Sequence, residues 1–250
     1  MRFIRIIYLI SAIGIGTFLS GGVQVFGQVT DTGGGDTGTR PPEDKPFRWG
    51  LKAGTTLNQF NQSGLTIGFN GGGFAKYSLG ELFDVQAELL YMMQGSSRDD
   101  YTRDLSDFGG DVVTERYTNR AVIFQNIVIP VMGVYKIGSV EGAIRPKAMA
   151  GLSAGYCAAA FERRDIIFSF SDGTTGISGQ DIENVGADYQ QFHFAFLVGF
   201  GVDYNLSNGK MFSYDVRYNG GLNDLNLFKT PDVGGAIYQT TVSINFSYGF

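Results

Sequence analysis

The amino-acid sequence is dominated by a two-residue rhythm in which large apolar residues alternate with small or polar ones. In the stretch "FHFAFLVGFGVDYN", every second residue from Phe192 to Tyr204 is large and apolar. Successive side chains of a β-strand point to opposite faces, so this alternation predicts strands with one apolar and one polar face. No segment from Phe47 onward repeats with a helical period. The sequence therefore predicts an all-β fold.

Eight segments of this kind follow one another between Phe47 and Phe250, and the connections between them alternate in length. The segments are 47–59, 65–79, 82–94, 121–136, 144–156, 192–205, 211–221 and 240–250. The short connections contain glycine and are typical of tight turns; they are 78–81, 137–142 and 206–210. The long polar connections predict solvated loops; they are 95–120, 162–189 and 222–236. One end of the protein thus carries turns and the other carries loops, except that the first connection, "FNQSG" (60–64), is short on the side where long ones are expected.

The polar faces of these segments carry charges of both signs, which can pair with one another. A soluble sandwich or calyx would turn its apolar face inward, yet here almost every segment has large aromatic residues on that face and charge is sparse. The opposite assignment, with lipid outside and charge inside, predicts an eight-stranded antiparallel up-and-down transmembrane β-barrel with a side-chain-filled lumen. The expected lumen charge network is Arg48, Lys52, Lys76, Asp84, Glu88, Arg145, Lys147, Asp203, Asp215 and Arg217.

Within that network, Glu88, Arg145 and Arg217 are expected to form a central group of ion pairs. Inward-facing glycines, among them Gly72 and Gly155, leave room for long side chains to cross the lumen. Pro130 lies in the middle of the fourth segment, where it is expected to forfeit one hydrogen bond of the strand ladder.

Aromatic residues fall at two levels along the expected strands, as in the girdles of membrane barrels. Strands that run in both directions contribute to each level. The turn-side girdle is expected to contain Trp49, Tyr77, Phe83, Tyr135, Tyr204, Phe212 and Tyr248, and the loop-side girdle Tyr91, Tyr156, Phe192, Tyr218 and Tyr238.

The segments before the first strand are of two kinds. Residues 1–27 have two arginines, an apolar run and a small-residue cleavage site, which predict a secretory signal peptide. Residues 28–46 are rich in Gly, Thr, Asp and Pro and predict a flexible linker. The barrel is expected to occupy 47–250 in a bacterial outer membrane, with periplasmic termini and extracellular loops. Cys157, the only cysteine, excludes an intramolecular disulfide.

Four stretches resemble the landmarks of PorT-type outer-membrane β-barrel proteins of Bacteroidetes. They are "WGLKAGTTLN", "AELLYMMQGSS", "NIVIPVMGVYK" and "VRYNGGLNDLN", in this order. The resemblance covers about residues 47–250 and implies an eight-stranded outer-membrane barrel in which Pro130 is a family feature. The name-giving member of the family is tied to the type IX secretion and gliding machinery, so the resemblance also implies a role in that machinery as an alternative.

The sequence offers few signals for chemistry, and we expect no catalytic residue, no cofactor and no metal ion. His193, the only histidine, faces the expected lumen without a spacing that marks a catalytic set. The acidic loops lack a recognised calcium spacing, so solvation is favoured over Ca²⁺ binding. The stretch "ERRD" at Glu162 leaves open an interaction with lipopolysaccharide phosphates. The net charge of −5 and the lack of a basic cluster exclude a nucleic-acid partner.

The sequence thus predicts a non-enzymatic structural or interaction module of the outer membrane. Its expected partners are outer-membrane lipids and lipopolysaccharide, the barrel assembly machinery during biogenesis, and an envelope or secretion-system protein. The alternatives are a role in type IX secretion, a soluble lipocalin-like carrier, and a lipid-modifying enzyme centred on His193. The final alternating residues are expected to act as the assembly signal; they are Val242, Ile244, Phe246, Tyr248 and Phe250.

Overall fold

The computed structural model describes residues 46–60, 64–98, 100–105, 111–138, 143–206, 208–225 and 236–250. The predicted signal peptide and all but the last residue of the predicted linker lie outside these ranges. Within them, none of the helical segments has the length and apolar character needed to cross a membrane.

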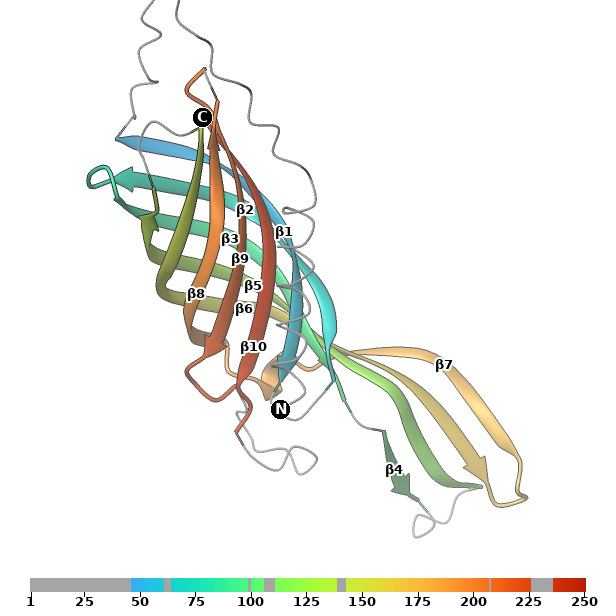
Figure 1. Cartoon of the computed structure of the whole chain (residues 1–250). Helices are drawn as coiled ribbons and strands as arrows, with labels where there is room; N and C mark the ends of the chain where they lie inside the picture. Colours follow the sequence, from blue (N-terminus) through green and yellow to red (C-terminus); the bar gives the residue numbers. More distant parts are fainter. Residues whose placement is uncertain are drawn as a thin grey trace, which may run out of the picture. The chain divides into compact units, whose positions relative to one another are not determined.

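In the described residues, ten strands form one antiparallel sheet (Figure 1). Eight of them pair in the order β1, β2, β3, β5, β6, β8, β9 and β10, and β10 pairs with β1 so that the ring closes. The predicted all-β fold, an eight-stranded antiparallel up-and-down β-barrel, is confirmed. The ring strands are β1 (Phe47–Phe60), β2 (Thr66–Ser78), β3 (Phe83–Ser97), β5 (Val112–Lys136), β6 (Ile144–Phe170), β8 (Phe192–Asn205), β9 (Met211–Gly221) and β10 (Gln239–Gly249).

The barrel is polar inside and apolar outside. Charged and amide side chains on the inner face are buried, whereas aliphatic and aromatic side chains such as Leu89, Leu152 and Phe246 are exposed on the outer face. A lipocalin-like carrier would need the reverse arrangement, so that alternative is wrong. Exposed apolar side chains around a whole barrel are instead suited to the hydrocarbon core of a membrane.

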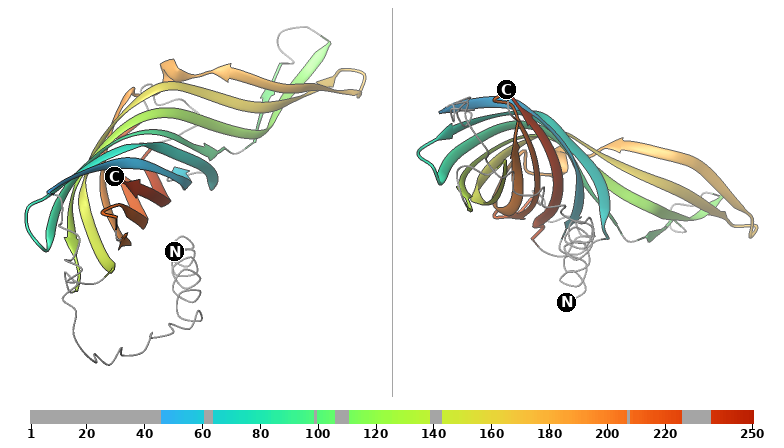
Figure 2. Two further views of the ribbon diagram at one scale, coloured as in Figure 1. Left: turned by 90° about the horizontal axis from the view of Figure 1, so that it is seen from above. Right: turned by 45° about the horizontal axis from the view of Figure 1, so that its top comes forward.

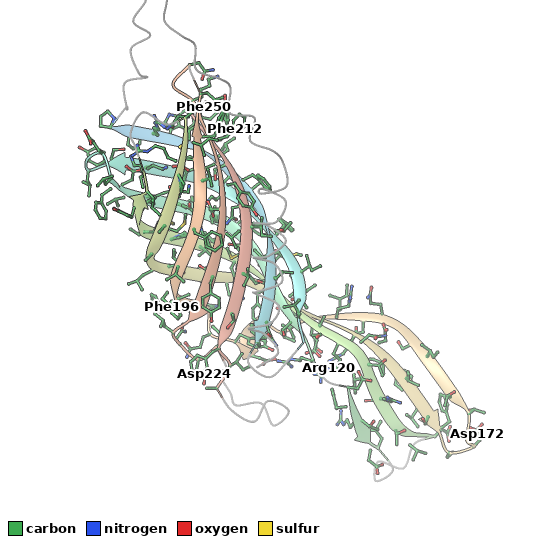
Figure 3. All side chains as sticks on the ribbon, in the orientation of Figure 1. Arg120, Asp172, Phe196, Phe212, Asp224 and Phe250 are labelled. Carbon is green, nitrogen blue, oxygen red and sulfur yellow. The ribbon has the colours of Figure 1, made fainter. Side chains whose placement is uncertain are left out.

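Aromatic side chains contact one another at both ends of the barrel. On the turn side, the rings of Trp49 and Phe250 lie 4.8 Å apart and those of Phe212 and Tyr248 lie 4.9 Å apart. On the loop side, the ring of Phe192 lies 5.3 Å from that of Tyr156. Figure 3 shows Phe212 and Phe250 together at one end and Phe196 towards the other.

The first two long loops expected from the sequence are instead largely β-structure. Strands β5 and β6 stay paired from Lys136 and Lys147 to Val112 and Phe170, well beyond the ring. Two strands outside the ring extend this hairpin: β4 (Tyr101–Asp104) pairs with β5, and β7 (Thr175–Asn184) pairs with β6 (Figure 2). We call these four strands the outer sheet: β4, residues 112–120 of β5, residues 161–170 of β6, and β7. A short 3-10 helix, η2 (Gly186–Asp188), follows β7.

Two irregularities in the pairing of β5 and β6 lie where the hairpin leaves the ring. One falls between Thr118 and Ala121, and Asn119 within it has a φ of 51°, in the left-handed region that asparagine tolerates. The Asn119 side chain donates a 2.8 Å hydrogen bond to Asp165. The other falls between Gln125 and Asn126. Bulges bend a strand and increase its twist, so these two redirect the hairpin out of the ring.

Pro130 lies on the inner face of β5, and the ladder around it is interrupted as the sequence predicts. The pairing of β3 with β5 passes from Ala87 and Val131 directly to Leu90 and Val128, without the two intervening pairs. On its other side Pro130 remains paired with Ser153 of β6. Proline lacks an N–H group, so the gap lies on the side where that donor is needed.

The inward glycines do more than leave room for side chains. A Cβ atom at Gly72 would meet the backbone oxygen of Leu89, and one at Gly151 would meet that of Val131. At Gly155 the obstacle is a side chain, the ring of His193. Glycine therefore allows a close approach of the neighbouring strand at Gly72 and Gly151, and of the His193 ring at Gly155.

Candidate functional site

The middle of the lumen holds a compact group of four charges, which we call the central cluster: Lys52, Glu88, Asp215 and Arg217. Arg217 donates two hydrogen bonds to the Glu88 carboxylate, at 2.8 and 2.9 Å. Lys52 Nζ lies 2.8 Å from Glu88 and 3.1 Å from Asp215. Arg217 Nε also lies 2.7 Å from an oxygen of Asp215. All four side chains are buried and the formal charges cancel, so the cluster blocks the lumen without leaving a net charge.

A second group of charges lies towards the turn side of the lumen. Asp203 accepts hydrogen bonds from Lys76 at 2.8 Å and from Lys147 at 2.5 Å. Asp84 pairs with Lys136 at 2.8 Å and lies 3.8 Å from Lys76. Together the two groups bring eight of the ten expected lumen charges into direct ion pairs.

The other two expected lumen charges, Arg48 and Arg145, lie close to this second group. Arg48 donates to the side chain of Asn205 at 2.9 Å, and Arg145 donates to the backbone oxygen of Glu81 at 2.8 Å. Both line a small cavity that Asp84 and Asp203 also line. Arg145 is thus separate from Glu88 and Arg217, with which the sequence grouped it.

Among the described residues, three buried charges lie outside the set expected from the sequence. Lys136 belongs to the turn-side group, and Arg120 and Glu162 form a 2.7 Å ion pair where the outer sheet joins the barrel. Lys136 could have been found from the strand period: it lies six residues after the inward Pro130, and residues an even number of positions apart on a strand share a face. No comparable signal exists for Arg120 and Glu162, since both fell in segments expected to be loops.

Between the central cluster and the loop side, the lumen is filled by uncharged polar side chains. Asn126 donates to Gln94 at 2.6 Å, and Gln94 donates to Thr241 at 3.0 Å. Thr241 in turn donates to Asn58 at 3.0 Å. Below them Asn245 donates to Asp215 at 2.8 Å, which links this layer to the central cluster. Hydrogen-bonded amides and hydroxyls thus continue the plug above the charges.

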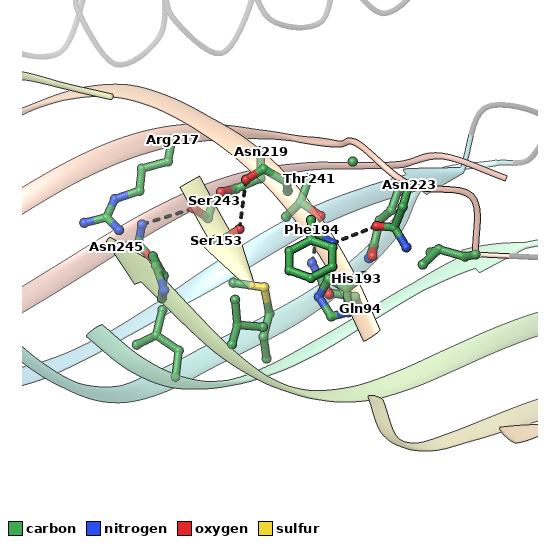
Figure 4. A pocket seen from close by; sticks show the side chains of 18 residues that line it. Gln94, Ser153, His193, Phe194, Arg217, Asn219, Asn223, Thr241, Ser243 and Asn245 are labelled. Atoms are coloured by element: carbon green, nitrogen blue, oxygen red, sulfur yellow. Dashed lines mark hydrogen bonds between the residues drawn. The ribbon is translucent and has the colours of Figure 1, made fainter. Parts of the chain in front are cut away.

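A cavity of about 30 Å³ lies next to this polar layer, and side chains from several strands line it (Figure 4). His193, Ser153 and Arg217 are among them, with Leu225 and Phe194 towards the loop side. This volume accommodates one or two water molecules but no larger solute. The charged side chain that shares the lining with His193 is a cation, Arg217, rather than a carboxylate that would orient a general base.

The base of the outer sheet is held by cation–π contacts and an ion pair. The Arg120 guanidinium lies 4.4 Å from the ring centre of Tyr101, which stacks 4.5 Å from the ring of Tyr117. Burial, together with the hydrogen bond that it donates to Glu115, raises the pKa of Tyr117 to about 12. The Tyr117 hydroxyl therefore remains protonated at neutral pH and keeps donating to Glu115.

The charged side chains of the "ERRD" stretch form ion pairs largely within the protein. Glu162 is buried against Arg120, and Arg164 pairs with Asp181 at 3.0 Å and with Glu183 at 2.6 Å across β7. In the described residues no group of three or more His, Cys, Asp or Glu side chains is placed to hold a metal ion. The expected assembly signal lies on β10 and, for Phe250, on the residue that follows it. Phe246 is exposed on the outer face and Val242 is buried; the role of these residues stays a prediction.

Comparisons with known proteins find similar solved structures at low sequence identity. No curated protein sequence matches the chain. Among solved structures, Neisserial surface protein A matches with a TM-score of 0.45 and 14% identity, over 82% of this chain and 98% of that one. The attachment invasion locus protein Ail of Yersinia pestis, solved with the heparin analogue sucrose octasulfate, matches with a TM-score of 0.35 and 12% identity, over 82% of this chain and 100% of that one. The outer membrane enzyme PagL matches with a TM-score of 0.37 and 13% identity, over 78% of this chain and 97% of that one.

The sequence itself matches a protein family. The family described as "Outer membrane protein beta-barrel domain" matches residues 26–226, which is more than half of the chain. The closed eight-stranded ring, its apolar outer face and its charged lumen agree with that description. The chain therefore belongs to the outer membrane protein beta-barrel domain family.

Proposed function

We propose that the protein is a plugged outer-membrane barrel that presents the outer sheet to the exterior of the cell as a binding surface, without catalysing a reaction. The observation that carries this proposal is the continuation of the β5–β6 pairing past the ring, through its bulges, widened to four strands by β4 and β7. A folded sheet of this kind presents fixed side chains and strand edges, which suit the recognition of another protein.

The orientation follows from the asymmetry of the connections. Membrane barrels of this class place short turns in the periplasm and long loops outside. The outer sheet lies on the loop side of the barrel, so it would be extracellular, and the turn joining β2 to β3 would be periplasmic. Outer-membrane lipids and lipopolysaccharide would then surround the apolar outer face between the two girdles.

The filled lumen favours this role over transport. The central cluster and the polar layer above it form a hydrogen-bonded plug, and the cavity of about 30 Å³ beside that layer holds no more than water. The lining of that cavity also supports a non-enzymatic role, because His193 shares it with Arg217 rather than with a carboxylate. An unchanged lipid profile in a His193→Ala strain would agree with this, and an altered profile would favour the lipid-modifying enzyme.

Purified protein in planar lipid bilayers is expected to show no stable ion conductance, because the plug leaves no continuous water path. A 16-stranded porin incorporated in the same way serves as the positive control, since such barrels leave an aqueous channel. Discrete, long-lived current steps from the unmodified protein would contradict the plugged lumen and favour a conduit.

The resemblance to PorT-type barrels supports a further, more specific proposal, namely that the protein also contacts a periplasmic partner and that this partner belongs to the type IX secretion machinery. The test is secretion of a tagged cargo protein in a deletion strain. Normal secretion would remove this role and leave the binding surface of the outer sheet unaffected.

A further inference from the structure

The two edges of the outer sheet differ strongly. The β4 edge is four residues long and carries the charged side chains Arg103 and Asp104, features that discourage strand pairing. The β7 edge is ten residues long, or about 33 Å, and contains no lysine, arginine or proline. Among the described strands β7 pairs with β6 alone, so its other edge is open. The β7 edge is thus the one suited to pairing with another strand.

Two isoleucines dominate the exposed side chains of β7. Ile177 is 77% exposed and Ile182 is 63% exposed. Residues five apart on a regular strand point to opposite faces, but the pairing of β6 with β7 shifts by one residue at Gly179. The shift puts both isoleucines on the same face, where Ile177 lies opposite Ile167 of β6. The bulge therefore places two exposed isoleucines on one face of the open edge, with Gln180 between them.

The acidic residues of β7 do not oppose pairing of this edge. Asp181 and Glu183 lie on the other face of the strand, where both form ion pairs with Arg164. Arg164 thus offsets one of the two negative charges, and a partner strand would meet a single residual charge on that face rather than a row of like charges.

We propose that the partner of this edge is a second copy of the chain, which pairs β7 with β7 in antiparallel orientation about a two-fold axis. The inference rests on the proposed function of the outer sheet as a binding surface. In the register that places Gly179 opposite Gln180, Ile177 of each copy faces Ile182 of the other. The same register puts Thr175 opposite Asn184 and Ser178 opposite Asp181, so no like charges meet.

This arrangement merges two four-stranded outer sheets into one of eight strands. It covers the long open edge of each copy and buries four isoleucines that are otherwise exposed to water. Both strands use the same surface, as an interface with two-fold symmetry requires. Other registers of the same pair leave at least one isoleucine opposite a polar residue or past the end of the partner strand.

Register-specific disulfide crosslinking tests the proposal. In a Cys157→Ser background, which removes the only cysteine, one tagged chain carries Ile177→Cys and a second carries Ile182→Cys. The two are reconstituted together in lipid vesicles and oxidised. Directly opposed residues lie within disulfide distance, whereas two copies of the same position are separated by five residue steps. We expect a crosslinked dimer from the mixture and none from either chain alone.

Two controls keep the result interpretable. Thr102→Cys on the exposed β4 edge, mixed with Ile182→Cys, is expected to give no crosslink. Ile182→Lys is expected to weaken dimerisation of the full-length protein about tenfold in analytical ultracentrifugation, because it removes two apolar cross-strand pairs. Heat-modifiable migration on gels verifies that each variant is folded.

The outcomes separate this inference from the proposed function. A monomeric protein with no crosslink in the mixture overturns the proposal, as does equal crosslinking in every combination. If a cysteine on the outer sheet is nevertheless labelled on intact cells, the proposed binding surface stands and its partner is another molecule. If it is not labelled, the proposed function itself fails.

Discussion

Replacing Leu152 with arginine is expected to destabilise the inserted barrel by about 2–4 kcal/mol, the cost of a charge on the lipid face near the bilayer midplane. Leu152 is 62% exposed on the outer face of β6 and pairs with Phe196 between the two girdles. If that face meets lipid, the arginine has no partner and must reach for the interface. Urea unfolding of the protein folded in lipid vesicles measures the effect.

Ile182→Arg provides a closely matched control. Ile182, like Leu152, is a branched aliphatic residue, and it lies on β7, next to β6. Its side chain is 63% exposed, almost the same as that of Leu152. It belongs to the outer sheet, which lies in water rather than lipid on this account. In a dilute, monomeric preparation, where the proposed β7 pairing contributes nothing, its replacement is expected to change the unfolding free energy by no more than about 0.5 kcal/mol. Equal effects at both positions would contradict the membrane assignment of the barrel face.

Replacing Glu88 with glutamine is expected to cost about 3–5 kcal/mol, although the side chain keeps its size. The change leaves Lys52 and Arg217 buried with Asp215 as their remaining anionic partner in the central cluster. An uncompensated buried charge is more damaging than the loss of the pair itself, so Glu88→Gln combined with Lys52→Met is expected to recover part of the loss. The midpoints of urea unfolding give these differences.

The matched control for this change is Asp100→Asn on the loop side. Asp100 lies 3.5 Å from Arg116, but the two side chains are 45% and 59% exposed. An ion pair in water contributes about 0–1 kcal/mol, so a small effect is expected. If Glu88→Gln proved as mild as Asp100→Asn, the lumen would have to be wet, and the plugged barrel would be the wrong description.

Most of the ring could be predicted from the sequence because each ring strand separates lipid from a polar lumen. That contrast requires apolar and polar residues to alternate in segments such as 192–205, whose predicted bounds match those of β8. The same reasoning put the ten expected charges inside, where they are buried. The structure adds which of these charges meet. Glu88 and Arg217 are 129 residues apart in the sequence, and alternation shows only that both face inward, not that they pair.

The outer sheet could not be predicted, because its two faces lack the contrast between lipid and polar lumen that marks the ring strands. In the proposed placement both of its faces meet water, and residues 112–120 and 161–170 mix Thr, Arg, Tyr and Ile without a regular alternation. Their strand structure comes from cross-strand contacts, such as the stacking of Tyr101 on Tyr117 and the pairing of Arg164 with Asp181. Such contacts join residues 16 or 17 positions apart, and periodicity does not reveal them.

Site-specific labelling of intact cells tests the central claim, that the barrel presents the outer sheet outside the cell. Ser171→Cys, at the exposed end of the β6–β7 hairpin, and Gly80→Cys, in the turn between β2 and β3, are each placed in the Cys157→Ser background. A membrane-impermeant maleimide is expected to label Ser171→Cys on intact cells and Gly80→Cys only after the outer membrane is permeabilised. Labelling in the reverse order, or of neither site before permeabilisation, would contradict the account.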